Sequence, residues 1–90
     1  MNDLQKYRNQ IDEIDRQIVS LIGERLQVLA GVAEYKKEHG LPALDEARWQ
    51  QVLAEKQKLA LSLGISTELI TDIYELIHQE ALRLENINLN

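Results

Sequence analysis

The fold is decided by residues 3–39, which read DLQKYRNQIDEIDRQIVSLIGERLQVLAGVAEYKKEH. This stretch contains no proline, and Gly23 and Gly31 are its only glycines. When successive residues are rotated by about 100° around a helix axis, the apolar ones gather within about 60° of Ile18. This apolar stripe consists of Leu4, Ile11, Ile14, Ile18, Leu21, Ile22, Leu29 and Val32. The pattern predicts one unbroken helix from about Asp3 to about His39.

Two interruptions divide the rest of the chain. Gly40, with Pro42 two residues later, is typical of a helix end. A second helix is predicted from an N-cap at Asp45 to about Ser62, and it ends at the break around Gly64. A third helix is predicted from an N-cap at Ser66 to about Glu85 or Asn86. The asparagine-rich residues after it are expected to fray.

The length of the first helix predicts an assembly. About 36 helical residues extend about 54 Å, roughly three times the average helix in globular proteins. Two shorter helices can cover only part of this rod, so a second copy of the chain is expected to cover the rest. The sequence therefore predicts an all-α fold with three helices per chain, a single domain over residues 1–90, and a homodimer or a larger oligomer.

Composition narrows the class of protein. The 15 acidic and 10 basic residues among 90 give a net charge of −5, which argues against a nucleic-acid-binding protein. There is no cysteine, and the two histidines, His39 and His78, are isolated, so no metal site is predicted. No apolar run approaches the roughly 18–20 residues that span a bilayer, and no signal peptide is visible. A cytoplasmic location is expected.

Charged residues continue the apolar stripe at an average spacing of about 3.5 residues. Arg25 lies about 20° from the centre of the stripe and Lys36 lies on it, while Arg8 and Asp15 lie nearer its edge. A buried cation without a partner is costly, so such residues are either paired or bind an anion. Two alternatives stay open: Arg8 and Lys36 snorkel out at the helix ends, and Arg25 pairs with Asp15 of a neighbouring helix.

The spacing of these cations suggests a small ligand with more than one carboxylate. Arg48 of the second helix adds a further arginine, which suits planar carboxylates through its two-pronged geometry. Arg25 and Lys36 are about 16 Å apart along the helix, so their long side chains can converge on a metabolite. Arg8 and Lys36 are about 42 Å apart. If Arg8 belongs to the same site, it comes from the other chain of an antiparallel dimer.

This order of residues resembles the all-helical chorismate mutase family over essentially the whole chain. An arginine, an Ile-Asp-x-Ile-Asp run, a second arginine, a lysine and a later arginine form a fairly specific series. The segments that carry the resemblance are Tyr7–Asp15, Glu24–Leu26, Val32–Lys37, Gly40–Pro42, Asp45–Arg48 and the break at Leu63–Ile65.

The resemblance implies an intertwined homodimer with two equivalent sites that converts chorismate to prephenate by a Claisen rearrangement. No cofactor and no covalent intermediate are implied. Arg25 would hold one substrate carboxylate, and Arg8 from the other chain would hold the second. Lys36 would contact a carboxylate and the ether oxygen of the bond that breaks. Asp45 and Arg48 would help to line the pocket.

Three positions depart from the most familiar family pattern. Trp49 replaces a glutamate that contacts the ring hydroxyl of the substrate, although some members resemble this chain in having an Arg-Trp pair. We expect Trp49 to pack against or cover the pocket mouth, with direct substrate contact as the alternative. Ala81 replaces a serine on the third helix, which removes one carboxylate contact.

Glu85 is the third departure, because it replaces a glutamine that donates a hydrogen bond to the ether oxygen. Fungal relatives resemble this chain in using a glutamate there. An ionised carboxylate only accepts hydrogen bonds, whereas the protonated acid can donate one. Our hypothesis is that Glu85 works as the neutral acid, which desolvation favours and nearby cations oppose. The alternative is that Glu85 faces solvent near a frayed helix end.

Other functions stay open at this point. Isochorismate–pyruvate lyase resembles the same family, and a 4-amino-4-deoxychorismate mutase is a further activity on this scaffold. Both alternative activities stay open because Trp49 replaces the usual glutamate. A third alternative is a non-catalytic helical module for dimerisation or regulation, but such a helix has no reason to carry Arg25 and Lys36 on its apolar face.

Overall fold

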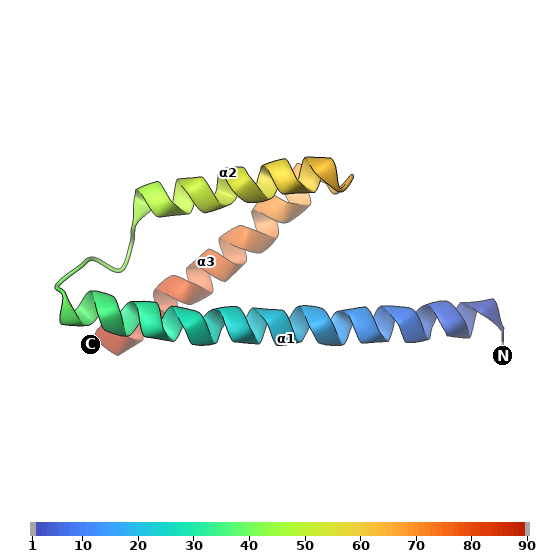
Figure 1. The fold of residues 1–90 in the computed structure, drawn as a ribbon, viewed down its shortest axis with the longest axis horizontal. Coiled ribbons are helices and arrows are strands. Elements are labelled where there is room, and N and C mark those ends of the chain that lie inside the picture. Colours follow the sequence, from blue (N-terminus) through green and yellow to red (C-terminus); the bar gives the residue numbers. More distant parts are fainter. Residues whose placement is uncertain (1, 90) are drawn as a thin grey trace.

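The computed structural model describes the backbone of residues 2–89 and the side chains of residues 2–85. Its three helices are α1 (Asp3–Glu38), α2 (Glu46–Ser62) and α3 (Thr67–Leu89), as Figure 1 shows. The predicted all-helical fold is confirmed. The predicted end of the third helix was wrong, because α3 continues to Leu89. Each asparagine in a helix lowers the stability of the helix by less than about 1 kcal/mol relative to alanine. The asparagines near the end of α3 are therefore not strong enough helix breakers to end it.

Local capping explains where the helices begin and end. The predicted N-caps are confirmed: Asp45 Oδ1 accepts from the Arg48 amide at 3.1 Å, and Ser66 Oγ accepts from the Leu69 amide at 3.2 Å. Gly40 and Gly64 have φ of +66° and +71°, so each turns the chain out of the preceding helix in a left-handed conformation. The backbone conformation of Gly40 thus sets the direction in which the loop leaves α1.

The helices form an open arrangement rather than a closed bundle. Figure 1 shows α3 running diagonally from the end of α2 back to the C-terminal end of α1. Within the described residues, α3 packs against both other helices, whereas the α1 and α2 backbones do not approach each other closely. The chain measures 57 × 25 × 14 Å, and its radius of gyration is 16.6 Å. A compact domain of this length has a radius of about 12 Å.

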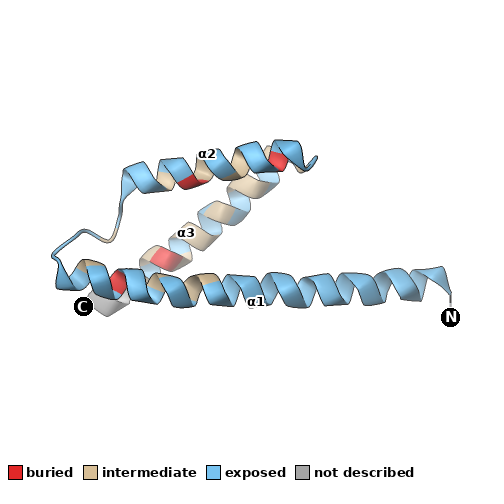
Figure 2. Cartoon of the chain, in the orientation of Figure 1, coloured by how far each residue is buried: buried red, intermediate tan, exposed pale blue. Residues whose placement is uncertain are grey.

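The single chain buries very little apolar surface. Among the described side chains, the buried apolar residues are Ala33, Val52, Ala60 and Ala81. The apolar stripe of α1 is half exposed at Ile18 (50%) and more exposed at Leu4 (56%), and Figure 2 shows the whole N-terminal half of this helix exposed. An exposed apolar face of this length marks an interaction surface. No helix within the described residues is long and apolar enough to cross a bilayer.

Candidate active site

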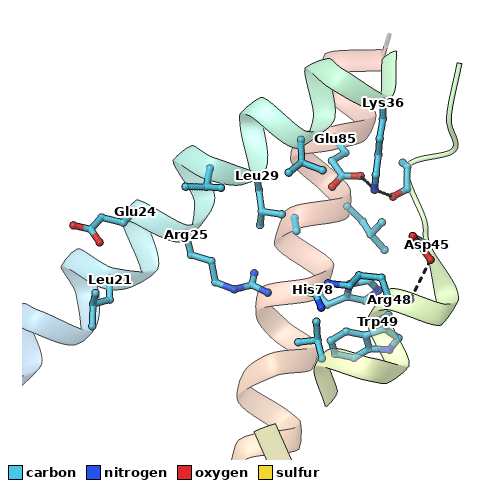
Figure 3. A pocket seen from close by; sticks show the side chains of 16 residues that line it. Leu21, Glu24, Arg25, Leu29, Lys36, Asp45, Arg48, Trp49, His78 and Glu85 are labelled. Carbon is cyan, nitrogen blue, oxygen red and sulfur yellow. Dashed lines mark hydrogen bonds and ion pairs between the residues drawn. The ribbon is translucent and has the colours of Figure 1, made fainter. Parts of the chain in front are cut away.

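A cavity of about 640 Å³ lies among the three helices. This volume is within the range of about 300–1,000 Å³ that is typical of small-molecule sites. Seven of the eight residues that the sequence singled out line it, and Figure 3 shows their side chains gathered around it. They are Arg25 and Lys36 of α1, Asp45 before α2, Arg48 and Trp49 of α2, and Ala81 and Glu85 of α3.

Lys36 closes one end of the cavity through two contacts. Its Nζ donates to the Ala43 carbonyl at 2.6 Å and lies 3.4 Å from Glu85 Oε2. Glu85 is only 4% exposed, so the alternative that it faces solvent at a frayed helix end is wrong. The backbone of α3 continues past Glu85 to Leu89, so Glu85 lies inside the helix, and its carboxylate points toward Lys36. A buried acid and a cation therefore meet where three segments of the chain converge.

Arg25 is the other charged residue that α1 contributes to the cavity. Its guanidinium carbon lies 5.8 Å from the centre of the Tyr74 ring, a cation–π contact with α3. Figure 3 shows the side chain extending from α1 toward His78. Among the described residues, no carboxylate lies within 4 Å of its guanidinium. The Arg25 cation is thus held over an aromatic face without an ion-pair partner among the described residues.

The start of α2 brings Asp45 and Arg48 to the cavity. Asp45 is occupied as the N-cap of this helix, with its Oδ1 bound to the Arg48 amide. The Arg48 side chain is exposed, and its Nη1 donates to Gln51 Oε1 at 2.9 Å. One neutral hydrogen bond leaves most of the five guanidinium N–H groups free for an anion.

His78 of α3 is a lining residue that the sequence reasoning missed. Its imidazole stacks on the indole of Trp49, with ring centroids 4.0 Å apart and planes within 5°. Trp49 is half-buried and lines the cavity. The available signal was spacing: His78, Ala81 and Glu85 follow one another at three and four residues, so they share one helix face.

Arg8 lies outside this cavity. It is exposed on α1, 17 positions before Arg25, which corresponds to about 26 Å along the helix. The side chain of an arginine cannot cover that distance. Within one chain, therefore, Arg8 does not meet the other predicted residues.

A sequence model of the family described as chorismate mutase type II matches residues 7–86. The chain belongs to this family. The match runs from the first residues of α1 almost to the end of α3, so it includes every residue of the cavity. The resemblance inferred from the residues is thereby confirmed.

Named relatives agree with membership of the chorismate mutase type II family. A T-protein of Enterobacter agglomerans is 34% identical over 84 residues, which are 93% of this chain and 22% of the relative. A chorismate mutase of Methanocaldococcus jannaschii is 32% identical over 82 residues, 89% of this chain and 83% of the relative. A 4-amino-4-deoxychorismate mutase of Streptomyces venezuelae is 26% identical over 86 residues, 96% of this chain and 84% of the relative. The chain spans about a fifth of the length of the T-protein.

Proposed function

We propose that this chain is a chorismate mutase that rearranges chorismate to prephenate in aromatic amino-acid biosynthesis. The observation that carries the proposal is the meeting of Arg25, Lys36, Arg48 and Glu85 around one cavity of metabolite size. Membership of the chorismate mutase type II family supports the same conclusion. We expect the enzyme to work in the cytoplasm, without a cofactor or a metal.

The reaction needs positioning and electrostatics rather than a nucleophile. In the Claisen rearrangement the ether carbon–oxygen bond breaks while a carbon–carbon bond forms, and no atom leaves the molecule. Arg25 and Arg48 are suited to hold the carboxylates in the compact, reactive conformer, because guanidinium groups bind carboxylates in two-pronged fashion. Lys36 can then donate to the ether oxygen, where negative charge develops.

Glu85 is proposed as the second donor to the ether oxygen. It can donate only when protonated. It is 4% exposed, and its Oε2 lies 3.4 Å from Lys36 Nζ, at the end of the cavity where the ether oxygen is proposed to lie.

We further propose an intertwined homodimer in which Arg8 reaches the cavity of the other chain. The exposed apolar stripe of α1 supports this assembly, because the described residues of one chain leave it uncovered. The cavity wall supports it too, since Leu21 and Val28 line the cavity and are still 60% and 70% exposed. The α1 helix of a second chain, lying antiparallel to the first, would cover this exposed wall of the cavity and place its Arg8 there.

Two other activities on this scaffold stay in competition. A mutase for 4-amino-4-deoxychorismate is favoured by the Streptomyces venezuelae relative, which bears that name and matches almost the whole chain. An isochorismate–pyruvate lyase stays open because Trp49 stands where a glutamate is usual. A non-catalytic dimerisation or regulatory module has less support, because it would not require cations around a cavity.

The proposal is tested by following the absorbance of chorismate at about pH 5 and about pH 7.5, with prephenate identified as the product. Turnover that is faster at the lower pH supports both the activity and a protonated Glu85. No turnover at either pH contradicts the proposal. Isochorismate and 4-amino-4-deoxychorismate are then the next substrates to test.

A further inference from the structure

Two contacts between α1 and α3 hold the cations that α1 contributes to the cavity. Arg25 lies over the ring of Tyr74, and Lys36 pairs with Glu85. The residues of each pair are 49 positions apart in the chain. Within each helix the two residues are about three turns apart, so they lie on one side of that helix. The two helices therefore meet in register at both contacts.

The two cations are held in chemically different ways. Lys36 Nζ donates to the Ala43 carbonyl and lies 3.4 Å from a Glu85 carboxylate oxygen. The Arg25 guanidinium carbon lies 5.8 Å from the centre of the Tyr74 ring, and among the described residues it has no ion-pair partner. A ring face attracts a cation without neutralising its charge. The five N–H donors of the guanidinium lie in its plane and are not taken up by a carboxylate of the chain.

Tyr74 acts on the cavity only through Arg25. Both residues are half-buried, but Arg25 lines the cavity and Tyr74 does not. The ring thus lies behind the guanidinium, on the side away from the space that a ligand would fill. Partial removal from water strengthens the attraction between a cation and a ring face. Tyr74 is therefore placed to fix the guanidinium without touching the ligand.

Holding a long side chain in place before the ligand arrives improves binding. Arginine has many rotamers, and ordering them during binding reduces affinity. An intramolecular carboxylate would also order Arg25, but a carboxylate ligand would then have to displace it. A ring face avoids this competition, because it orders the cation and leaves its donors free.

We propose that Tyr74 is a positioning residue that holds Arg25, through its ring face, in the orientation that binds a carboxylate of the substrate. This assignment rests on the proposed function, because it takes chorismate as the dianion that Arg25 binds. The ring, and not the hydroxyl group of Tyr74, makes the contact. The negative charge on the ring face is the property that matters.

Replacing the ring is the first test, with kcat/KM for chorismate as the measurement. Tyr74→Phe keeps the ring and should retain nearly the wild-type value. Tyr74→Leu keeps an apolar side chain without a ring, and kcat/KM should fall about 5- to 30-fold, as expected for the loss of one cation–π contact. Circular dichroism checks that each variant is folded. A Tyr74→Leu protein with wild-type kcat/KM would overturn the assignment.

Fluorinated rings separate electrostatic positioning from packing. Phenylalanines that carry one, two and three ring fluorines are incorporated at position 74, because each fluorine withdraws negative charge from the ring face and changes its shape little. The logarithm of kcat/KM should fall stepwise along this series. The matched control is the same series at position 35, since Tyr35 is exposed and does not line the cavity. It should show no trend.

The outcomes distinguish this assignment from the proposed function. If wild-type protein converts chorismate and kcat/KM does not change with fluorination at position 74, the ring only fills space. The assignment is then wrong while the proposed function stands. The fluorinated series decides this even if Tyr74→Leu does not fold. If wild-type protein does not convert chorismate, the proposed function fails and takes this assignment with it.

Discussion

The ammonium of Lys36 lies 3.4 Å from the carboxylate of Glu85, which follows it by 49 positions in the chain. The same ammonium donates to the Ala43 carbonyl at 2.6 Å. Lys36 therefore ties the end of α1, the following loop and the C-terminal part of α3 to one point. In the proposed reaction this point is where the ether oxygen of the substrate would lie, between two hydrogen-bond donors.

The pH dependence of turnover should follow Glu85. If the neutral acid donates to the ether oxygen, kcat should rise as the pH falls from about 7.5 to about 5. Glu85→Gln donates at every pH, so its profile should be flat over this range. Steady-state kinetics of both proteins across the range provides the measurement. A wild-type rate that does not change with pH would show that the charged carboxylate is tolerated.

Removing Arg25 or Lys36 should strongly reduce turnover without unfolding the protein. Arg25→Ala and Lys36→Ala each remove a cation that faces the dianion, and we expect kcat/KM to fall by about 100-fold or more. The matched control is Arg16→Ala, because Arg16 is exposed on α1, outside the cavity, and pairs with Glu13 on the same helix. It should retain nearly full activity. If the Arg25 or Lys36 variants lose their helical circular dichroism, their cations serve the fold instead.

Arg8 should act in the other subunit, and mixed dimers can show this. Arg8→Ala and Lys36→Ala are each expected to be inactive alone. When they are unfolded together and refolded, about half of the dimers should be mixed, and each mixed dimer contains one intact site. Activity should therefore recover to about a quarter of the wild-type value.

The control for complementation is a mixture of Arg25→Ala and Lys36→Ala. These residues line the same cavity of one chain, so every site in a mixed dimer still lacks one of them. No activity should return. Recovery in this control, or none in the Arg8 mixture, would contradict the proposed exchange of Arg8 between chains.

The apolar stripe of α1 should hold the dimer together. Ile18 is half exposed in the single chain, so a second copy is needed to bury it. Ile18→Asp would bury an unpaired carboxylate in the interface, at a cost of about 3 kcal/mol or more. We expect a monomer, or loss of folding, by analytical ultracentrifugation and thermal unfolding. Ser20→Asp, on the opposite face of the same helix, should leave the assembly unchanged.

Gly40 should be required for the sharp turn after α1. Its φ of +66° is strained for any residue with a side chain, so Gly40→Ala should destabilise the protein by about 1 kcal/mol. Gly31→Ala is a contrasting control, because Gly31 lies inside α1 with no atom near the position of an added Cβ. It should stabilise the protein by up to about 1 kcal/mol. Denaturant unfolding of the two variants measures both effects.

Much of the fold could be predicted because its signals are local. The caps at Asp45 and Ser66 and the turn at Gly40 depend on residues within a few positions of each other. The position of Arg25 and Lys36 on the apolar stripe follows from helical periodicity alone. The end of α3 was harder to predict, since asparagines weaken a helix by small amounts and do not stop it.

By itself, the sequence determined three helices, their caps, an α1 too long for one chain to cover, and the cations on its apolar face. Helical periodicity and capping require only neighbours along the chain. Only the tertiary structure decided that Glu85 is buried beside Lys36 and that His78 stacks on Trp49. These pairs join different helices, and their meeting depends on how α3 crosses between α1 and α2. That crossing is set by packing of whole helix faces, which no short stretch of sequence encodes.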